Sequence, residues 1–197
     1  MVTETVPYLD TAEAAKLIKR RLATVFPGQR FSVRTSRYAG GSSIDVSWTD
    51  GPRTKLVEHE TAPFEGKGFD GMIDMAYSKD TWILPDGSAQ RAAIHGTEGS
   101  RGSTPSYVTD APHPNAKLVR ASCFVFCRRD LSNTTDQINA AGAYIRRHYK
   151  IDPSPDGNPM GDRFGNDWVH NLASNMAYDR SEGEGWDRPF ARVVLRE

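Results

Sequence analysis

The stretch RFSVRTSRYAGGSSIDVSWTDGP, residues 30–52, decides the fold. Apolar or β-branched side chains alternate with polar ones in residues 31–36 and again in residues 44–49. This alternation is the period of a strand that buries one face. A glycine-containing turn lies between the two runs, and an Asp-Gly-Pro sequence ends the second. Because such a turn joins neighbouring antiparallel strands, we predict a β-hairpin over residues 30–49.

The Gly-Gly-Ser-Ser sequence inside this stretch could instead hold a phosphate or a catalytic serine. A phosphate-binding loop places its glycines before the N-terminus of a helix, where backbone amides face the anion. Here the glycines join two strands, without the lysine of a P-loop or the order of a nucleophile elbow. We therefore interpret Ser42 and Ser43 as turn residues. Asp45, on the polar side of the hairpin with Arg34, stays a candidate functional residue.

The elements on either side of the hairpin predict an α+β fold. Asp10 and Glu13 form a capping box, and apolar residues at helical spacing predict a helix over residues 10–26. Hairpins connect most of the strands, so we expect a largely antiparallel sheet with helices packed on it. The other expected elements are a short helix within 53–64, a hairpin within 81–94, a long strand over 117–129, a helix capped by Ser132, a helix ending near 178 and a last strand over 190–195.

The composition suggests how these elements are divided. A chain of 197 residues with 38% hydrophobic residues can bury one substantial core or two small ones. We expect an α+β domain over residues 1–95 and a continuation over residues 117–197, packed into the same globule. Residues 96–116, rich in Gly, Ser, Thr and Pro, are predicted to form a flexible loop between them.

The charge balance limits the kinds of partner. Twenty-five basic and twenty-five acidic residues cancel, so no global field attracts the chain to nucleic acid or an anionic membrane. Contact with either would need a local patch. No apolar run approaches the roughly 20 residues that span a bilayer, and the N-terminus lacks a signal-peptide pattern. We expect a cytoplasmic protein without membrane contact.

Cysteine and histidine spacing gives no sign of a cofactor. Cys123 and Cys127 lie four residues apart in a predicted strand, about 13 Å between α-carbons, too far for a disulfide. We predict that both are buried thiols. The histidines lie apart, without the spacing typical of metal ligands, so we expect neither a metal nor a cofactor; they are His59, His95, His113, His148 and His170.

Two aspartates in the ambiguous segment GFDGMIDMAY raise a catalytic alternative. On a helix, Asp70 and Asp74 would share a face and could hold a cation. As turn residues they would accept hydrogen bonds from backbone amides, which we favour because aspartate beside glycine commonly forms turns. The alternative function is a metal-dependent hydrolase or nuclease-like enzyme; its candidate residues are Asp45, Asp70, Asp74 and His95.

Basic residues cluster at two further places. Arg128 and Arg129 end the predicted long strand, whereas Arg146, Arg147 and Lys150 lie at the C-terminal end of a predicted helix, where they complement its dipole. A solvated surface is the simpler interpretation. The alternative is that these five residues contact nucleic acid or a protein partner.

The first part of the chain resembles a known family. LIKRRLATVFPGQRFSVRTSRYAGGSSIDVSWTDGP, followed by FEGKGFDGMIDMAY, is similar to the large polyvalent protein-associated domain numbered twenty-nine in its series, over about residues 14–77. The resemblance implies a phage, plasmid or other mobile-element setting, and no catalytic residues. Our leading hypothesis is therefore a non-catalytic accessory or counter-defence protein that binds a partner; a nucleic-acid-binding module is the other binding hypothesis.

Overall fold

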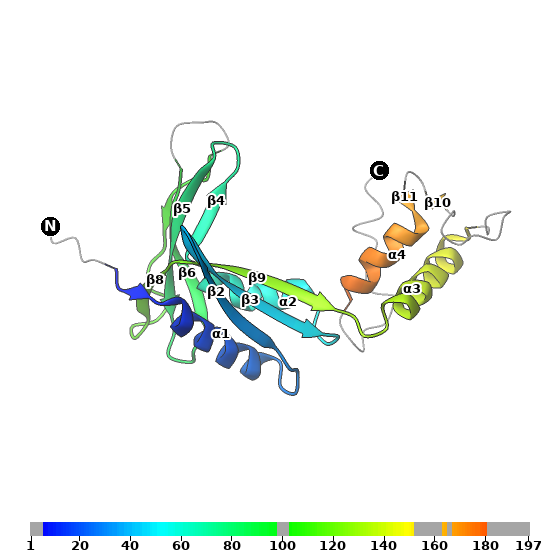
Figure 1. Ribbon diagram of the computed structural model, residues 1–197, viewed down its shortest axis with the longest axis horizontal. Helices are drawn as coiled ribbons and strands as arrows, with labels where there is room; N and C mark the ends of the chain where they lie inside the picture. Colours follow the sequence, from blue (N-terminus) through cyan, green and yellow to red (C-terminus); the bar gives the residue numbers. More distant parts are fainter. Residues whose placement is uncertain (1–5, 98–102, 152–162, 165–166, 181–197) are drawn as a thin grey trace. The chain divides into compact units, whose positions relative to one another are not determined.

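The fold is described from a computed structural model, which describes residues 6–97, 103–151, 163–164 and 167–180 (Figure 1). The chain divides into two compact units. Unit 1 comprises residues 1–48 and 56–128, and unit 2 comprises residues 49–55 and 129–197. The predicted α+β class is confirmed, because helices and mostly antiparallel strands occur together.

The predicted hairpin is confirmed. Strand β2 (Ser32–Tyr38) pairs antiparallel with β3 (Gly41–Thr49), and Arg34 lies opposite Asp45. Gly40, in the connecting turn, has a φ of 91°, a conformation that favours glycine. Strand β9 (Cys123–Asp130) adds to β3 and completes a three-stranded sheet.

The interpretation of Ser42 and Ser43 as turn residues is wrong. Both lie within β3 and are buried, because the turn is confined to the two residues before Gly41. The Ser42 hydroxyl oxygen lies 2.8 Å from that of Thr11, so Ser42 links the hairpin to the first helix.

A second, six-stranded sheet lies in unit 1. Its main order is β1-β8-β5-β6-β7, and β4 also pairs with β5. Every pairing is antiparallel except that of β1 with β8, which confirms the largely antiparallel sheet. The strands are β1 (Tyr8–Leu9), β4 (Lys67–Asp70), β5 (Met75–Ile83), β6 (Ala89–His95), β7 (Tyr107–Val108) and β8 (Lys117–Ala121).

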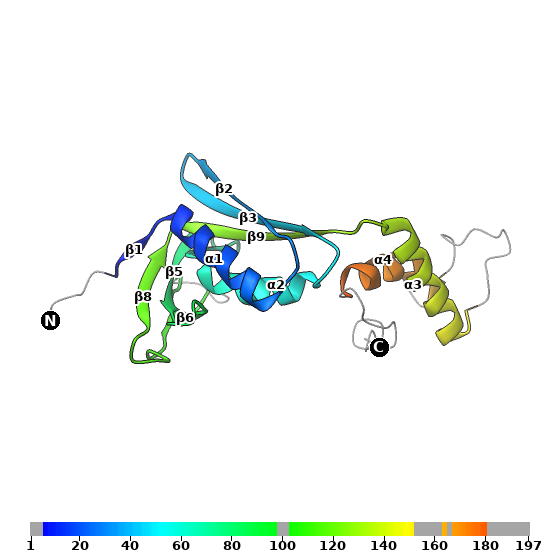
Figure 2. The ribbon, with the colours of Figure 1, turned by 90° about the horizontal axis from the view of Figure 1, so that it is seen from below.

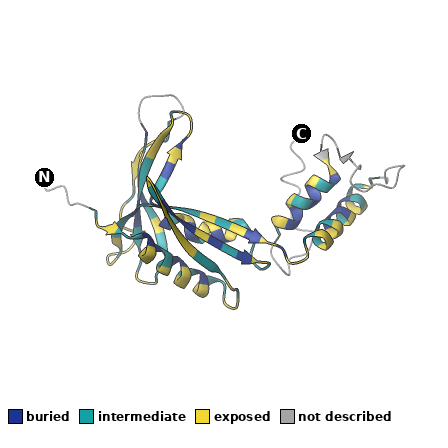
Figure 3. Cartoon of the chain, in the orientation of Figure 1, coloured by how far each residue is buried: buried dark blue, intermediate teal, exposed yellow. Residues whose placement is uncertain are grey.

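Helices α1 (Thr11–Val25) and α2 (Thr54–Thr61) lie on the same side of the three-stranded sheet (Figure 2). Asp10 caps α1 as predicted, since its carboxylate accepts a hydrogen bond from the Ala12 amide. Buried and exposed residues alternate along α1 (Figure 3). The buried core of unit 1 includes Ile18, Leu22, Ile44, Val46, Trp48, Val57, Phe64 and Cys123.

The core of unit 2 lies between two helices, α3 (Thr134–Tyr149) and α4 (Val169–Tyr178). Ile145 of α3 and Leu172 of α4 are buried in it. A two-stranded ladder of β10 (Arg163–Phe164) and β11 (Asp167–Trp168) precedes α4. The prediction that Ser132 caps α3 is wrong: the N-cap is Asn133, without a side-chain capping bond.

The long strand expected before the third helix is two strands. The single strand predicted over residues 117–129 is wrong, because the chain passes from β8 in one sheet to β9 in the other at Ser122. Side-chain alternation along the chain does not show where a strand leaves one sheet and joins another.

The strand predicted over residues 190–195 lies outside the described residues. Within the predicted loop 96–116, β7 pairs with β6. The described helices include none that is long and apolar enough to cross a membrane.

Candidate functional site

The six-stranded sheet has a covered face, whose side chains bind the 3-10 helix η1 (Ala62–Phe64) and the residue after it. The Arg91 guanidinium donates from Nη2 to the Ala62 carbonyl at 2.6 Å and from Nη1 to the Glu65 carbonyl at 2.7 Å. Thr81 donates to the Pro63 carbonyl, and Lys79 pairs with the Glu65 carboxylate. These bonds hold η1 and Glu65 against the covered face.

The opposite side of this sheet, which we call the open face, follows from the strand register. Residues opposite each other on neighbouring strands point to the same face, as do residues two apart on one strand. Next to the row of Trp82 and Leu118, the register therefore places three further rows of side chains on the open face. They are Tyr8, Arg120, Asp80, Ala93 and Val108; then Lys67, Ser78 and His95; then Phe69 and Ala76.

The open face exposes aromatic rings. Tyr8 is 63% exposed and Phe69 is 56% exposed. Trp82, two residues after Asp80 and opposite Leu118, lies on the same face and is half-buried; its indole nitrogen donates to the Thr109 carbonyl at 3.3 Å. Large apolar side chains at the surface of a soluble protein often mark an interaction site.

A charged cluster lies between these rings. Asp80 is only 3% exposed, and both its carboxylate oxygens are bound. Arg120 donates from Nε to Oδ1 at 2.5 Å and from Nη2 to Oδ2 at 2.8 Å, a bidentate pair. His95 Nε2 lies 2.6 Å from Oδ2 and 2.9 Å from Arg120 Nη2, so the imidazole edge contacts both members of the ion pair.

The electrostatics of this cluster favour the ionised form of the Asp80 carboxyl. Burial by itself raises the pKa of Asp80, but hydrogen bonds and charges from Arg120 and His95 outweigh it and hold that pKa below its usual value. The same hydrogen bond raises the pKa of Arg120. The carboxylate is buried while both partners are partly exposed, so an approaching ligand meets cationic and imidazole groups first.

The candidate aspartates do not converge. Asp45 is exposed on β3 and accepts from the Ser43 hydroxyl at 3.2 Å. Asp70 is buried and accepts from the amides of Met72 and Thr104 and the hydroxyl of Thr97, at distances of 3.0, 3.0 and 2.6 Å. Asp70 thus behaves as the backbone-binding residue that the turn interpretation predicts.

Asp74 lies in the turn before β5, with a φ of 54°. By register, Asp70 points to the covered face, away from His95. Among the described residues, no group of three or more His, Cys, Asp or Glu side chains is placed to hold a metal ion.

Of the four sequence candidates, only His95 joins a cluster of polar side chains, and its partners were missed. A hairpin within residues 81–94 brings the residues just outside it together, so a ladder extended past the hairpin could have suggested Asp80 as a neighbour of His95. Arg120 reaches Asp80 from a distant strand, and nothing local in the sequence signals that pairing.

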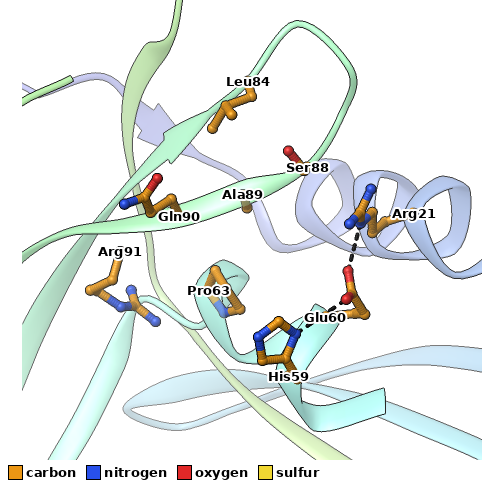
Figure 4. Close-up of a pocket in the computed structure, with 9 residues that line it drawn as sticks. All are labelled: Arg21, His59, Glu60, Pro63, Leu84, Ser88, Ala89, Gln90 and Arg91. Atoms are coloured by element: carbon orange, nitrogen blue, oxygen red, sulfur yellow. Dashed lines mark hydrogen bonds and ion pairs between the residues drawn. The ribbon is translucent and has the colours of Figure 1, made fainter. Parts of the chain in front are cut away.

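A pocket of about 370 Å³ opens elsewhere in unit 1 (Figure 4). Arg21 Nε donates to Glu60 Oε2 at 2.7 Å, and His59 Nδ1 lies 3.2 Å from Glu60 Oε1. Both Glu60 oxygens are therefore engaged, which leaves no ready general base in that carboxylate. The remaining lining residues are Pro63, Leu84, Ser88, Ala89, Gln90 and Arg91.

The five predicted contact residues differ in accessibility. Arg128 is exposed on β9 in unit 1, and Arg147 and Lys150 are exposed at the C-terminal end of α3 in unit 2. Arg146, also in the last turn of α3, is half-buried. Arg129 is 6% exposed, and its guanidinium donates to the carbonyls of Asp50 and Tyr178. These two hydrogen bonds lie within unit 2.

Comparison with known proteins places the chain in a family. The family model described as large polyvalent protein associated domain 29 matches residues 9–132, and the chain belongs to this family. The match extends past the similarity expected over residues 14–77 and takes in every strand of both unit 1 sheets except the first residue of β1. Membership associates the chain with phages and mobile genetic elements. No curated protein and no solved structure matches.

Proposed function

We propose that this member of the large polyvalent protein associated domain 29 family is a non-catalytic accessory or counter-defence protein that binds a partner on its open face. The family supports the mobile-element setting. The open face supports the mode of action, because it combines exposed rings with partly exposed cations.

The observation that carries this proposal is the contrast in side-chain use across the six-stranded sheet. Thr81, Arg91 and Lys79 are bound to η1 and the residue after it on one face. On the other, Tyr8 and Phe69 remain more than half exposed. Exposing two aromatic rings to water is unfavourable, and binding a partner would remove their apolar surface from water. Exposed apolar groups of this kind often mark a recognition surface.

The alternative of a metal-dependent enzyme receives less support. Cation-dependent hydrolysis needs several oxygen ligands that converge on one point. Asp45 lies on the three-stranded sheet, and Asp70 is taken up by three protein donors. The Asp80 carboxylate is neutralised by Arg120. Each of these carboxylates is bound by protein groups near it, and they do not converge on a common position for a metal ion.

Affinity capture from phage-infected or plasmid-bearing cells tests the proposal. The tagged wild-type chain is compared with a Tyr8→Ala/Phe69→Ala variant and with a matched control, Tyr38→Ala/Phe126→Ala. The control removes one tyrosine and one phenylalanine of similar exposure, 51% and 54%, from the three-stranded sheet. We expect the open-face variant to lose a specific partner that the control retains. Equal capture by all three proteins would refute binding on the open face.

A further inference from the structure

We infer that the partner of the open face is single-stranded nucleic acid, an inference that rests on the proposed function. Proteins that bind single strands combine aromatic side chains, on which bases stack, with cations that follow the phosphates. The open face has both kinds of group within its three rows.

The aromatic rings lie at the two ends of this arrangement. Tyr8 belongs to the row that contains Asp80, and Phe69 belongs to the row that contains Ala76. Four residues of β5 separate these rows, which is about 14 Å at about 3.4 Å per residue. A few extended nucleotides span such a distance, so one strand can reach both rings.

The cations lie on the same face as the rings. Lys67 is in the middle row with His95, and Arg120 is in the row of Tyr8. Arg120 holds Asp80 through Nε and Nη2, which leaves Nη1 without a partner among the residues that the structure describes. Lys67 donates to the Gly40 carbonyl and has two further N–H groups. These donors can bind the phosphates of a strand whose bases stack on Tyr8 and Phe69.

The buried carboxylate of Asp80 holds the polar groups of the open face in place. Asp80 is the only carboxylate in the three rows, and it is 3% exposed. It orients Arg120 and His95 without presenting negative charge to a phosphate. The exposed donors of the open face, on Lys67 and at Nη1 of Arg120, can therefore bind a phosphate, although the whole chain has no net charge.

The same arrangement favours a single strand over a duplex. Stacking on a protein ring requires a free base face, and in a duplex these faces are covered by neighbouring base pairs. Reading a duplex in its major groove usually requires a protruding helix or ribbon. A row of rings and cations on a sheet surface provides neither.

Fluorescence anisotropy with labelled oligonucleotides tests the inference. The probes are a mixed-sequence single-stranded RNA, the corresponding DNA strand, and the duplex of that DNA. We expect one or both single strands to bind more tightly than the duplex. Tyr8→Ala and Phe69→Ala should each weaken single-strand binding about tenfold, the scale of one lost base stack. The Tyr38→Ala/Phe126→Ala control should bind like the wild type.

A salt titration tests the phosphate contacts. Each contact to a single strand contributes about 0.7 to the slope of log affinity against log salt. With contacts from Lys67 and Arg120, the expected slope is about −1.4, and Lys67→Gln should reduce its magnitude by about 0.7. Unchanged thermal unfolding of each variant shows that it is folded.

The outcomes separate this inference from the proposed function. Preference for RNA or for DNA identifies the kind of strand, and either result supports the inference. It is overturned if neither single strand binds at low salt, or if the open-face and control variants lose affinity equally. If the cellular partner is lost in the open-face variant, survives nuclease treatment and is a protein, the inference fails while the proposed function stands. If capture is also independent of the open face, both fail.

Discussion

The two faces of the six-stranded sheet differ in how their polar side chains are used. On the covered face, Arg91 and Thr81 are bound to backbone carbonyls of η1 and its neighbour. On the open face, Arg120 and His95 are held by one buried carboxylate, while Tyr8 remains exposed. The first arrangement stabilises unit 1. The second keeps charged and aromatic groups in place and accessible, which is what a binding surface requires.

The largest predicted effect is on the free energy of unfolding. It comes from comparing two phenylalanines, one beside the covered face and one on the open face. Phe64, in η1, is fully buried in the core of unit 1, whereas Phe69 is on the open face. Phe64→Ala should lower the free energy of unfolding by about 3–5 kcal/mol. Phe69→Ala should change it by no more than about 0.5 kcal/mol. Urea denaturation measures both, and similar losses would contradict the division into a covered and an open face.

The next effect concerns an arginine on the covered face. Arg91→Met keeps much of the apolar stem but leaves the carbonyls of Ala62 and Glu65 without their guanidinium donor. We expect a loss of about 1–3 kcal/mol. Arg34→Met, at an exposed position on β2, is the matched control and should cost less than about 0.5 kcal/mol. An Arg91 variant as stable as this control would show that these bonds contribute little.

A smaller, pH-dependent effect is expected from the Asp80 cluster. The pKa of Asp80 is lowered in the folded state, so its ionised form contributes stability at pH values above the ordinary value near 3.9. That contribution is lost as the pH falls through the lower, folded pKa. Asp80→Asn should therefore be less stable than the wild type at pH 7, with the difference narrowing below about pH 4. A difference independent of pH would mean that the ion pair with Arg120 contributes no stability.

The smallest predicted effect is slow chemical modification of the Cys123 thiol, which is buried beside the covered face. Burial raises the pKa of the Cys123 thiol to about 11 and also raises the pKa of the Cys127 thiol. At pH 8 only about one Cys123 in a thousand is a thiolate, the form that reacts. A thiol reagent followed by mass spectrometry should modify Cys123 of the folded protein far more slowly than that of the unfolded protein. Comparable rates would mean that the covered side of unit 1 opens readily.

The fold was predictable where its signals are local. The hairpin over residues 30–49 combines strand alternation with a glycine turn, and the first helix has both a cap and an apolar stripe. The turn within 81–94 was equally clear. In each case the residues that determine the element are close together in the sequence, so periodicity and turn chemistry suffice.

The open face was not predictable from the same signals. It depends on parallel pairing of Tyr8 with Arg120 and on antiparallel pairing of Arg120 with Asp80, contacts between distant segments. An irregularity of register between Asp80 and Thr81 also shifts the partners on β6. The sequence pointed to His95 as a candidate, but its neighbours follow only from the assembled sheet.

The most direct test of the central claim is ultraviolet crosslinking of the full chain to a single-stranded oligonucleotide, with the modified residues located by mass spectrometry. We predict adducts on the open face, at Tyr8, Phe69 or Trp82, and their loss when unlabelled single strand competes. Adducts confined to the basic end of α3, around Arg146, Arg147 and Lys150, would contradict it, because nucleic acid would then bind unit 2 and not the open face.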